Sequence, residues 1–261
     1  MDLNLSKIEF SSSDKKRDII IPNKITKELA ELIGIIIGDG STGIYKGKGY
    51  IHYEIRFYGH KNEDFEYYKN NVNKLFKKLF NVNLKIRNYK SQGNTSFITI
   101  DSKAIVFFLS KILKIPTGQK SSITKIPNYI KTSSIEIKTA FMKGLADTDA
   151  SLTFKKKHKD KHYYPIISLN QKSEKMIKDV DKMLKIFGFH TYTQYNIIKK
   201  DSRGFNTKSH SIYLSGKKNL ENWMNLIGFN NPKHKTKYLI WKKFGFCQPY
   251  TTLIQRNKIL N

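Results

Sequence analysis

Apolar and polar residues alternate from position 50 to position 58, the period-two pattern of a half-buried β-strand. One face of that strand would carry apolar and aromatic side chains, and the other would carry His52, Glu54 and Arg56. Apolar residues then recur at helical spacing over 65–79. Two further strands and a second helix are predicted next, near residues 84–89, 97–100 and 102–113.

The same order of elements recurs later in the chain. A strand is predicted over 163–169, and it is followed by a helix whose N-cap is Ser173. Strands near 190–197 and 209–214 come next, before a final helix that begins at the cap Ser215. A helix precedes each series, and the first such helix, over 28–39, is unusually apolar. We assign each half the order α-β-β-α-β-β-α, in which the strand directly after that first helix is not delineated. The pattern therefore predicts an α+β fold of two pseudo-symmetric halves.

Two short motifs stand at corresponding points of these halves. Residues 32–40 read LIGIIIGDG and residues 142–150 read MKGLADTDA, and an Ile-Pro-Asn tripeptide precedes each motif. Asp39 and Asp149 are 110 residues apart, and 112 residues follow the second acid. We divide the chain into an N-terminal arm, a first half, a second half and a C-terminal tail, which span 1–27, 28–122, 123–247 and 248–261.

Each motif is predicted to be the end of a helix with a strip of small residues. Gly34 and Gly38 lie four positions apart in the first motif, as do Gly144 and Thr148 in the second. Residues at that spacing lie on one helix face, so the backbone of another helix could approach closely there. Two such helices packed side by side would bring the two motif acids to the same end.

That placement is unfavourable without a cation. A carboxylate at a helix C-terminus faces the negative pole of the helix dipole, at a cost of roughly 0.3–1 kcal/mol, and two adjacent carboxylates repel each other. Hard oxygen ligands favour Mg²⁺, for which Mn²⁺ would substitute, and such metals support in-line attack on a phosphate. We predict a metal site of Asp39 and Asp149 with Gly38 and Thr148. The alternative is a pair of exposed acids beside turns, and their recurrence favours the metal site.

Charge indicates the class of partner. The chain has 48 Lys and Arg against 21 Asp and Glu, a net charge of +27, and its isoelectric point is about 9.9. A polyanion that neutralises this charge is the simplest explanation, and nucleic acid is the commonest one. A lysine-rich proteome and an anionic membrane surface are the alternatives.

Cysteine and hydropathy restrict the compartment. Cys247 is the sole cysteine, which excludes an internal disulfide framework and is typical of a reducing environment. The sequence has neither a cysteine cluster nor a histidine pair spaced for zinc. No stretch approaches the roughly 20 apolar residues of a membrane span, and residues 1–10 lack the apolar core of a signal peptide. We expect a cytoplasmic protein without a membrane partner.

The two motifs resemble the LAGLIDADG motif, and with the β-rich segment after each copy the chain resembles the single-chain, two-motif LAGLIDADG homing endonucleases. The resemblance implies that the motif helices form the interface between halves and that two antiparallel sheets form a saddle over DNA. It also implies that Asp39 and Asp149 bind the metal. Ala150 and Lys143 depart from the motif. Asp147 matches a motif acid that is usually structural, so we assign it no catalytic role.

The resemblance implies further site residues. A polar residue is expected after the first long strand of each half, and Gln171 matches in the second half, whereas the first-half position falls on His60 or Lys61. A basic residue is expected near the end of each half, for which Lys120 and either Lys233 or Lys235 are the candidates. Side chains suited to base edges or phosphates are those of Arg56, Lys85, Arg87, Tyr192 and Gln194.

Two functions compete. The leading hypothesis is a monomeric, site-specific endonuclease that makes a staggered double-strand cut in a pseudo-palindromic site of about 20 base pairs. The alternative is a non-cutting binder of the same fold, either an RNA maturase with intron RNA as its partner or a transcriptional regulator. Loss of an acid would favour the binder, and both acids are present. An intein is disfavoured because no N-terminal Cys or Ser nucleophile is found.

Overall fold

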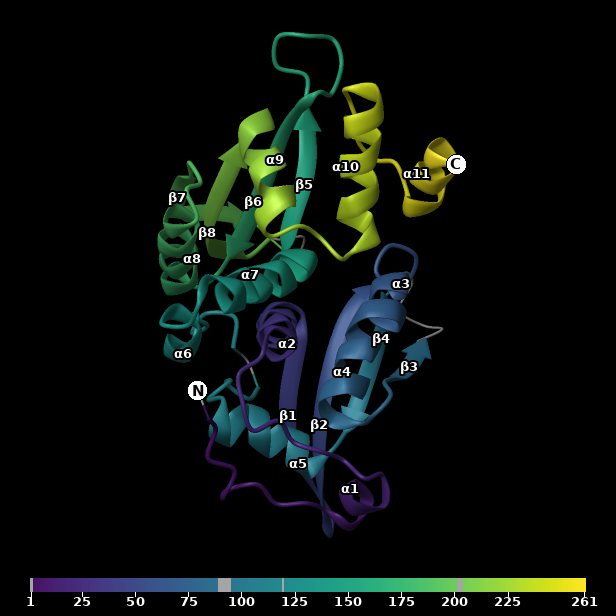
Figure 1. Cartoon of the computed structure of the whole chain (residues 1–261), viewed down its shortest axis with the longest axis vertical. Coiled ribbons are helices and arrows are strands. Elements are labelled where there is room, and N and C mark those ends of the chain that lie inside the picture. Colours follow the sequence, from purple (N-terminus) through teal and green to yellow (C-terminus); the bar gives the residue numbers. More distant parts are fainter. Residues whose placement is uncertain (1, 89–94, 119, 201–203) are drawn as a thin grey trace. The chain divides into compact units, whose positions relative to one another are not determined.

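The computed structural model describes residues 2–88, 95–118, 120–200 and 204–261. These residues form two compact units (Figure 1), Met1–Lys120 with Ser134–Leu145 and Ser121–Ser133 with Ala146–Asn261. Each unit is built around one antiparallel four-stranded sheet, and the strand orders are β1-β2-β4-β3 and β5-β6-β8-β7. The predicted α+β fold of two αββαββα halves is confirmed.

The first unit begins with a short helix and continues through the first motif. Its elements are α1 (Ser12–Lys16), α2 (Lys27–Gly38), β1 (Gly40–Gly47), β2 (Tyr50–His60), α3 (Phe65–Tyr67), the π-helix η1 (Tyr68–Val72), α4 (Asn73–Phe80), β3 (Lys85–Asn88), β4 (Thr95–Asp101), α5 (Lys103–Phe107) and the π-helix η2 (Phe108–Ile112). The N-terminal arm packs on this unit, since Asp14 is buried and accepts a hydrogen bond from the Ala104 amide at 3.1 Å.

The second unit repeats this order and adds two helices. Its elements are α6 (Asn128–Lys131), the end of α7 (Ile135–Asp149), β5 (Ala150–Lys155), β6 (Tyr164–Gln171), α8 (Glu174–Ile186), β7 (Tyr192–Lys200), β8 (Asn206–Ser215), α9 (Lys217–Leu226), α10 (Pro232–Phe244) and α11 (Leu253–Leu260). Helix α7 begins in the first unit and ends in the second.

Local details differ from the sequence-based expectation at three places. The helix predicted over 102–113 is α5 followed by the π-helical η2, and Ser102 is the N-cap of α5. The final repeat helix is capped by Gly216 rather than Ser215. The edge strand β1 was not delineated, because its second half is exposed on both faces and lacks alternation.

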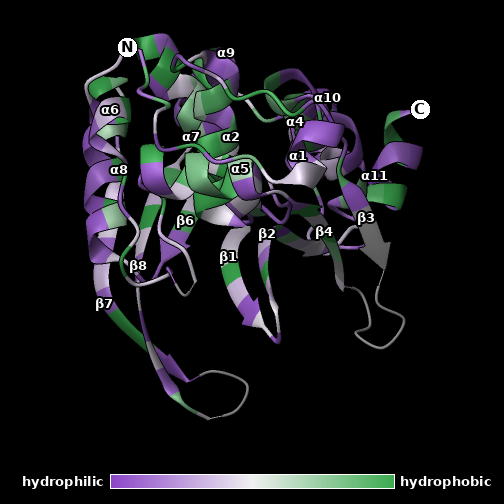
Figure 2. Cartoon of the chain, turned by 90° about the horizontal axis from the view of Figure 1, so that it is seen from below, coloured by the Kyte–Doolittle hydropathy of each residue, from purple (hydrophilic) through white to green (hydrophobic). Residues whose placement is uncertain are grey.

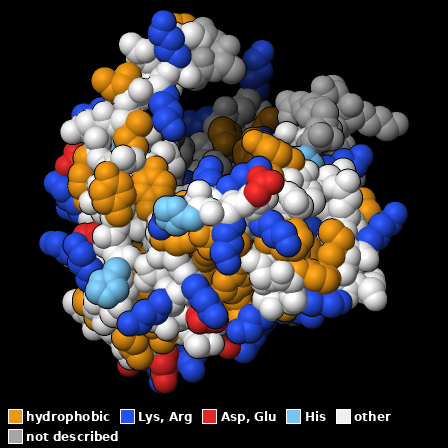
Figure 3. Space-filling view, turned by 90° about the horizontal axis from the view of Figure 1, so that it is seen from above, with side chains coloured by type: hydrophobic (Ala, Val, Ile, Leu, Met, Phe, Trp, Pro, Cys, Tyr) orange, Lys and Arg blue, Asp and Glu red, His pale blue; other side chains and the backbone are white. Residues whose placement is uncertain are grey.

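Each sheet has a core face and an open face. In the first unit, Ile55 and Phe57 are fully buried, whereas the next residue, Tyr58, is 45% exposed. The helices gather on one side of the strands and leave the other side uncovered (Figure 2). We call the uncovered side of each sheet its open face. On the face of the molecule seen in Figure 3, Lys and Arg side chains are widespread.

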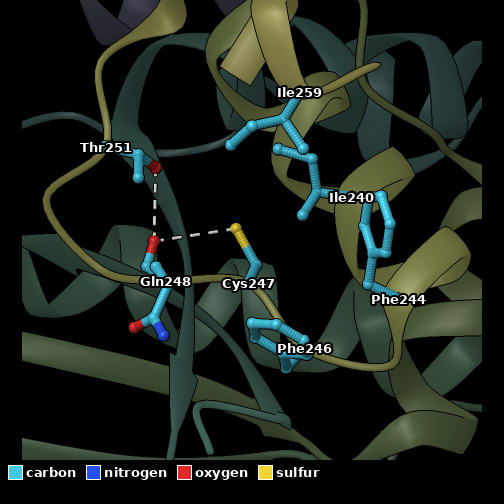
Figure 4. Close-up of a pocket in the computed structure, with 7 residues that line it drawn as sticks. All are labelled: Ile240, Phe244, Phe246, Cys247, Gln248, Thr251 and Ile259. Atoms are coloured by element: carbon cyan, nitrogen blue, oxygen red, sulfur yellow. Dashed lines mark hydrogen bonds between the residues drawn. The ribbon is translucent and has the colours of Figure 1, made fainter. Parts of the chain in front are cut away.

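The C-terminal segment packs on the second unit. Arg256 of α11 is 1% exposed, and its Nε donates to Thr236 Oγ1 of α10 at 2.8 Å. Between α10 and this segment lies an apolar pocket of about 180 Å³ against which Cys247 lies (Figure 4). Burial raises the pKa of the Cys247 thiol. Among the described residues, no helix combines the length and the apolar composition needed to cross a bilayer.

Candidate active site

Between Leu29 and Ile37 the first motif helix is buried except at Glu31. The Thr26 hydroxyl caps α2 by accepting from the Leu29 amide at 3.2 Å. A Cβ added at Gly34 would lie 2.7 Å from the Leu145 backbone nitrogen, and one added at Gly144 would lie 2.9 Å from the Glu31 carbonyl carbon. Two helix backbones therefore touch at these glycines, as the strip of small residues predicted.

Asp39 is the C-cap of α2, with φ −84° and ψ −11°. The Tyr68 hydroxyl from η1 donates to Asp39 Oδ2 at 3.0 Å and also lies 3.2 Å from the Tyr58 carbonyl oxygen. The Lys120 ammonium donates to the carbonyls of Ile36 and, at 2.8 Å, Ile37. Those carbonyls lie at the negative end of the helix, where a cation is favourable. Lys120 thus stands at the end of α2 that carries Asp39.

Asp149 is the last residue of α7, and the Gln171 side-chain amide at the end of β6 donates to its Oδ2. Both acids are half-buried. These two donors, a hydroxyl and an amide, are neutral, so these two bonds orient the carboxylates without contributing a positive charge. The family resemblance implied a site role for Gln171, whereas Tyr68 was not predicted.

Asp147, the preceding motif acid, is buried and holds the loop after α9. Its Oδ1 accepts hydrogen bonds from the amides of Asn230 and Asn231, both at 2.9 Å, and the Asn231 side chain donates back to the Asp147 carbonyl at 2.9 Å. A buried carboxylate satisfied by backbone amides supports the structure. This agrees with the structural role expected for Asp147.

Strand register corrects the position equivalent to Gln171 in the first half. Gly40 pairs with Phe57 and Ala150 pairs with Leu169, so the residue two further along is Gly59 in the first half and Gln171 in the second. His60 or Lys61 was expected instead.

The structure also explains why this position is a glycine. A Cβ at Gly59 would lie 2.6 Å from Tyr68 Cε2, so the glycine makes room for the tyrosine ring that reaches Asp39. His60 is exposed, and its Nδ1 accepts from the amides of Asn62 at 3.2 Å and Glu63 at 3.3 Å. The imidazole therefore caps a turn.

The basic candidates of the second half, Lys233 and Lys235, lie near the start of α10. Lys235 is exposed on α10 and has no hydrogen bond or ion pair with any described residue, and Lys233 is half-buried. In the second motif helix, the carbonyl equivalent to that of Ile37 is the carbonyl of Asp147. It accepts a hydrogen bond from the Asn231 side-chain amide. Lys237, which sequence reasoning missed, donates to the Leu152 carbonyl of β5 at 3.2 Å.

The candidate DNA-contacting residues share one property. By strand register, the backbone positions of all five belong to the open faces. Lys85 is exposed, the Arg87 side chain lies outside the described residues, and Tyr192 is 61% exposed. Gln194 donates to the Tyr192 hydroxyl at 3.2 Å. Arg56 belongs to a wider network that is described below.

A family model matches part of the chain. Residues 136–228, which run from the second motif helix into the loop after α9, match the model of a LAGLIDADG-like domain.

Solved structures match over most of the chain. A structure of I-DmoI in complex with DNA and Ca superposes with a TM-score of 0.53 and 19% sequence identity, covering 78% of this chain and 90% of that one. The structure of the LAGLIDADG homing endonuclease I-GzeII in complex with its DNA target gives a TM-score of 0.53 at 12% identity, with coverage of 85% and 90%. The fold of this chain is that of these proteins, and the resemblance drawn from the two motifs is confirmed.

Curated relatives carry other names. The glutamine–fructose-6-phosphate aminotransferase of Methanocaldococcus jannaschii is 26% identical over 209 residues, or 80% of this chain and 17% of that protein. The tRNA-splicing ligase RtcB of Methanopyrus kandleri is 25% identical over 229 residues, or 81% and 22%. This chain thus spans about a fifth of their length. An aminotransferase and an RNA ligase share no reaction, so the matched segment supports neither activity here.

Proposed function

We propose that this chain, which has the fold of the LAGLIDADG homing endonucleases, is a metal-dependent, site-specific double-strand DNA endonuclease. The observation that carries the proposal is the recurrence of one acid at the end of each motif helix, each with a neutral hydrogen-bond donor from a following element. The two motif helices are in backbone contact at Gly34 and Gly144. We infer that Asp39 and Asp149 form one catalytic centre.

The two acids suit a hard divalent cation. Carboxylate oxygens are the ligands that Mg²⁺ takes, usually one or two of them with water and substrate phosphate completing the shell. Asp39 and Asp149, with the adjacent Gly38 and Thr148, would hold the ion. We propose Mg²⁺, with Mn²⁺ as a substitute; structures of I-DmoI contain DNA with Ca or Mn. A bound divalent ion supplies Lewis acidity and lowers the pKa of water.

The remaining residues act through position and charge. Tyr68 and Gln171 fix the orientation of the two carboxylates, because each donates to an Oδ2 atom. We propose that the Lys120 ammonium, held at the end of α2 by two carbonyls, stabilises negative charge that develops on the scissile phosphate. Lys235 and Lys233 remain candidates for such a role in the second half, and His60 is the weakest candidate because it caps a turn.

DNA would lie across the two open faces. The net charge of +27 favours a polyanion, and the open faces carry the exposed Lys85, Tyr192 and Gln194. Unlike side chains at matching positions, such as Arg56 and Ser168, would read unlike half-sites. We therefore propose a long target that is only approximately palindromic. One chain supplies both acids, so a monomer would be the active species.

The test is cleavage selection from a randomised DNA library with Mg²⁺, Mn²⁺ or no divalent ion. We expect one long site to be recovered as double-strand cuts only when a divalent ion is present. The double variant Asp39→Asn/Asp149→Asn should bind that site but leave it uncut. The matched control Asp160→Asn alters a carboxylate that pairs with Lys156 in an exposed loop, and it should cut normally. Specific binding without cutting by the intact chain would favour the non-cutting binder, with intron RNA as the next ligand to test.

A further inference from the structure

A charged network lies on the open face of the first sheet, apart from the two motif acids. Glu54 of β2 belongs to that face and is only 7% exposed. His52 Nε2 lies 3.4 Å from Glu54 Oε2 and 3.2 Å from Asp101 Oδ1. On its other side, Glu54 pairs with Arg56. The network thus links β2 to β4, which are neighbours in the sheet.

The Arg56 guanidinium is held on three sides. Its Nε lies 2.6 Å from Glu54 Oε1, and its Nη2 donates to Glu54 Oε2 at 2.9 Å. Its Nη1 donates to the Tyr58 hydroxyl at 3.1 Å, and its Cζ lies 5.1 Å from the centre of the Phe97 ring. The Arg56 side chain is nonetheless 32% exposed.

Five N–H groups belong to a guanidinium. Two of those of Arg56, one on each terminal nitrogen, donate to Tyr58 and Glu54, and Nε lies close to Glu54 without a hydrogen bond. The second N–H on each terminal nitrogen has no partner among the described residues. Two donors on neighbouring nitrogens of a fixed planar group match the O6 and N7 acceptors of guanine in the major groove. A groove of about 470 Å³ adjoins Arg56 and is lined in part by Tyr45, Tyr50 and His52.

Charge argues that this arginine does not bind a phosphate. Glu54 offsets the charge of the guanidinium, and Asp101 adds a second carboxylate nearby, so Arg56 attracts a phosphodiester less than would a cation unpaired among the described residues, such as Lys46 in the same groove. In a chain with 48 basic residues, phosphate contacts are available at many other positions. Acids on this face are better explained by orientation of the arginine, which matters for base readout.

We propose that Arg56 reads a guanine base in one half of the DNA target and that Glu54 is its positioning residue. This inference rests on the proposed function and names a determinant of its specificity. Strand register places Ser168 and Ile166 at the equivalent positions of the second sheet. Neither side chain can present a guanidinium, so the second half-site carries no matching guanine requirement. The network therefore makes the two half-sites unlike.

The experiment is selection of binding sites from a randomised duplex library without divalent ions, using the full chain. Wild type should select one position at which guanine is required. Arg56→Lys keeps the charge but cannot donate in parallel to O6 and N7, so it should reduce the preference for guanine at that position by roughly 10- to 100-fold. Preferences at the other positions and the salt dependence of binding should not change.

Glu54→Gln tests whether Glu54 positions Arg56 or only stabilises the fold. Removing one negative charge should raise affinity for unrelated DNA, while the looser guanidinium loses preference for guanine at the same position. Lys185→Ala, on α8, which packs on the core face of the second sheet, is the charge control and should preserve every base preference. Circular dichroism and thermal unfolding verify that each variant is folded.

Two outcomes would overturn the inference, and they are distinguishable. If wild type selects a site and Arg56→Lys selects the same site, the guanine contact is refuted while the proposed function stands. A change only in overall affinity and in the salt slope, by about one unit, would make Arg56 a phosphate ligand. If wild type selects no DNA sequence, the proposed function itself fails.

Discussion

The two halves hold their motif acids by different means. In the first half, Tyr68 reaches Asp39 from a π-helical segment that follows the strand. In the second, Gln171 reaches Asp149 from the strand itself. The difference begins with Gly59, which stands where the second half has Gln171 and leaves space for the tyrosine ring. A symmetric backbone therefore supports an asymmetric site.

The ends of the motif helices show the same contrast. Helix C-termini leave carbonyls without intrahelical partners. In the first half the Lys120 ammonium satisfies the carbonyl of Ile37. In the second half the equivalent carbonyl, that of Asp147, is satisfied by the neutral Asn231 amide. One backbone requirement is thus met by a cation in one half and by a neutral amide in the other.

The halves should behave alike only at the helix contact. Gly34→Ala and Gly144→Ala should each destabilise the protein by about 3 kcal/mol, because the added methyl meets backbone atoms that cannot move aside. By thermal unfolding, that loss corresponds to a fall in Tm of roughly 6–12 °C. Glu136→Ala, at an exposed position of α7, the helix that carries Gly144, is the control. Stability unchanged in either glycine variant would contradict the close backbone contact.

The halves should differ in how strongly catalysis depends on the donor to each acid. Gln171→Leu removes an amide that can both donate and accept, and we expect cutting to slow by about 100-fold. Tyr68→Phe removes one hydroxyl and should slow cutting by about 10-fold. Single-turnover rates on the selected site measure both. Equal rates for the two variants would mean that the asymmetry has no catalytic consequence.

Gly59→Ala tests the origin of the difference. The methyl would lie 2.6 Å from Tyr68 Cε2 and 3.1 Å from Asp64 Cβ, so the tyrosine must shift. We expect a loss of about 1–3 kcal/mol in unfolding free energy and a cutting rate close to that of Tyr68→Phe. Gly59→Ala combined with Tyr68→Phe should slow cutting no further than Tyr68→Phe alone. Additive effects on the cutting rate would show that Gly59 acts independently of Tyr68.

Acid should destabilise the second half through His234, for which the first half has no counterpart in the described residues. His234 on α10 is 2% exposed, and its ring nitrogens have no partner there. Burial, with Lys233, Lys237 and Arg256 nearby, lowers its pKa well below 6.5. The unfolded chain therefore binds a proton that the folded chain excludes, so stability falls as pH drops below about 6.5.

The expected slope from this histidine is at most about 1.4 kcal/mol per pH unit. Denaturant unfolding between pH 7 and pH 5 measures it. His234→Phe, beside the aromatic ring of Phe229, should flatten the dependence, whereas His158→Gln at an exposed position should not. An unchanged slope in His234→Phe would exclude this group as its source.

The spacing of apolar residues predicted the fold because buried positions recur at the same spacing along each strand and helix. Residues of β2 alternate between core and open face, so Phe57 and Tyr58 could be assigned to opposite sides from sequence alone. The motif acids were placed at helix ends for a similar reason, since the apolar run ends at Ile37. Asp147 was separated from the metal site only by resemblance, and its contacts with the loop at Asn230 supply the physical reason.

Side-chain partners could not be predicted in the same way. The first-half equivalent of Gln171 was predicted one or two residues beyond Gly59. The hydropathy pattern does not reveal strand register, here the pairing of Gly40 with Phe57. Tyr68 was assigned to a core helix, and it is 2% exposed, but its hydroxyl reaches the acid. Periodicity identifies a buried aromatic without showing where its polar atom points. Among many lysines, only coordinates distinguish Lys237 from Lys235.

The central claim is that two unlike halves contribute to one catalytic centre, and strand-resolved cleavage tests it most directly. Each strand of the selected duplex is labelled separately and cut by wild type, Asp39→Asn and Asp149→Asn with Mg²⁺. Losing one shared carboxylate should remove several kcal/mol of transition-state stabilisation, so each single variant should cut both strands at least about 1000-fold more slowly. If either variant still cuts one strand at the wild-type rate, each half works alone and the shared centre is wrong.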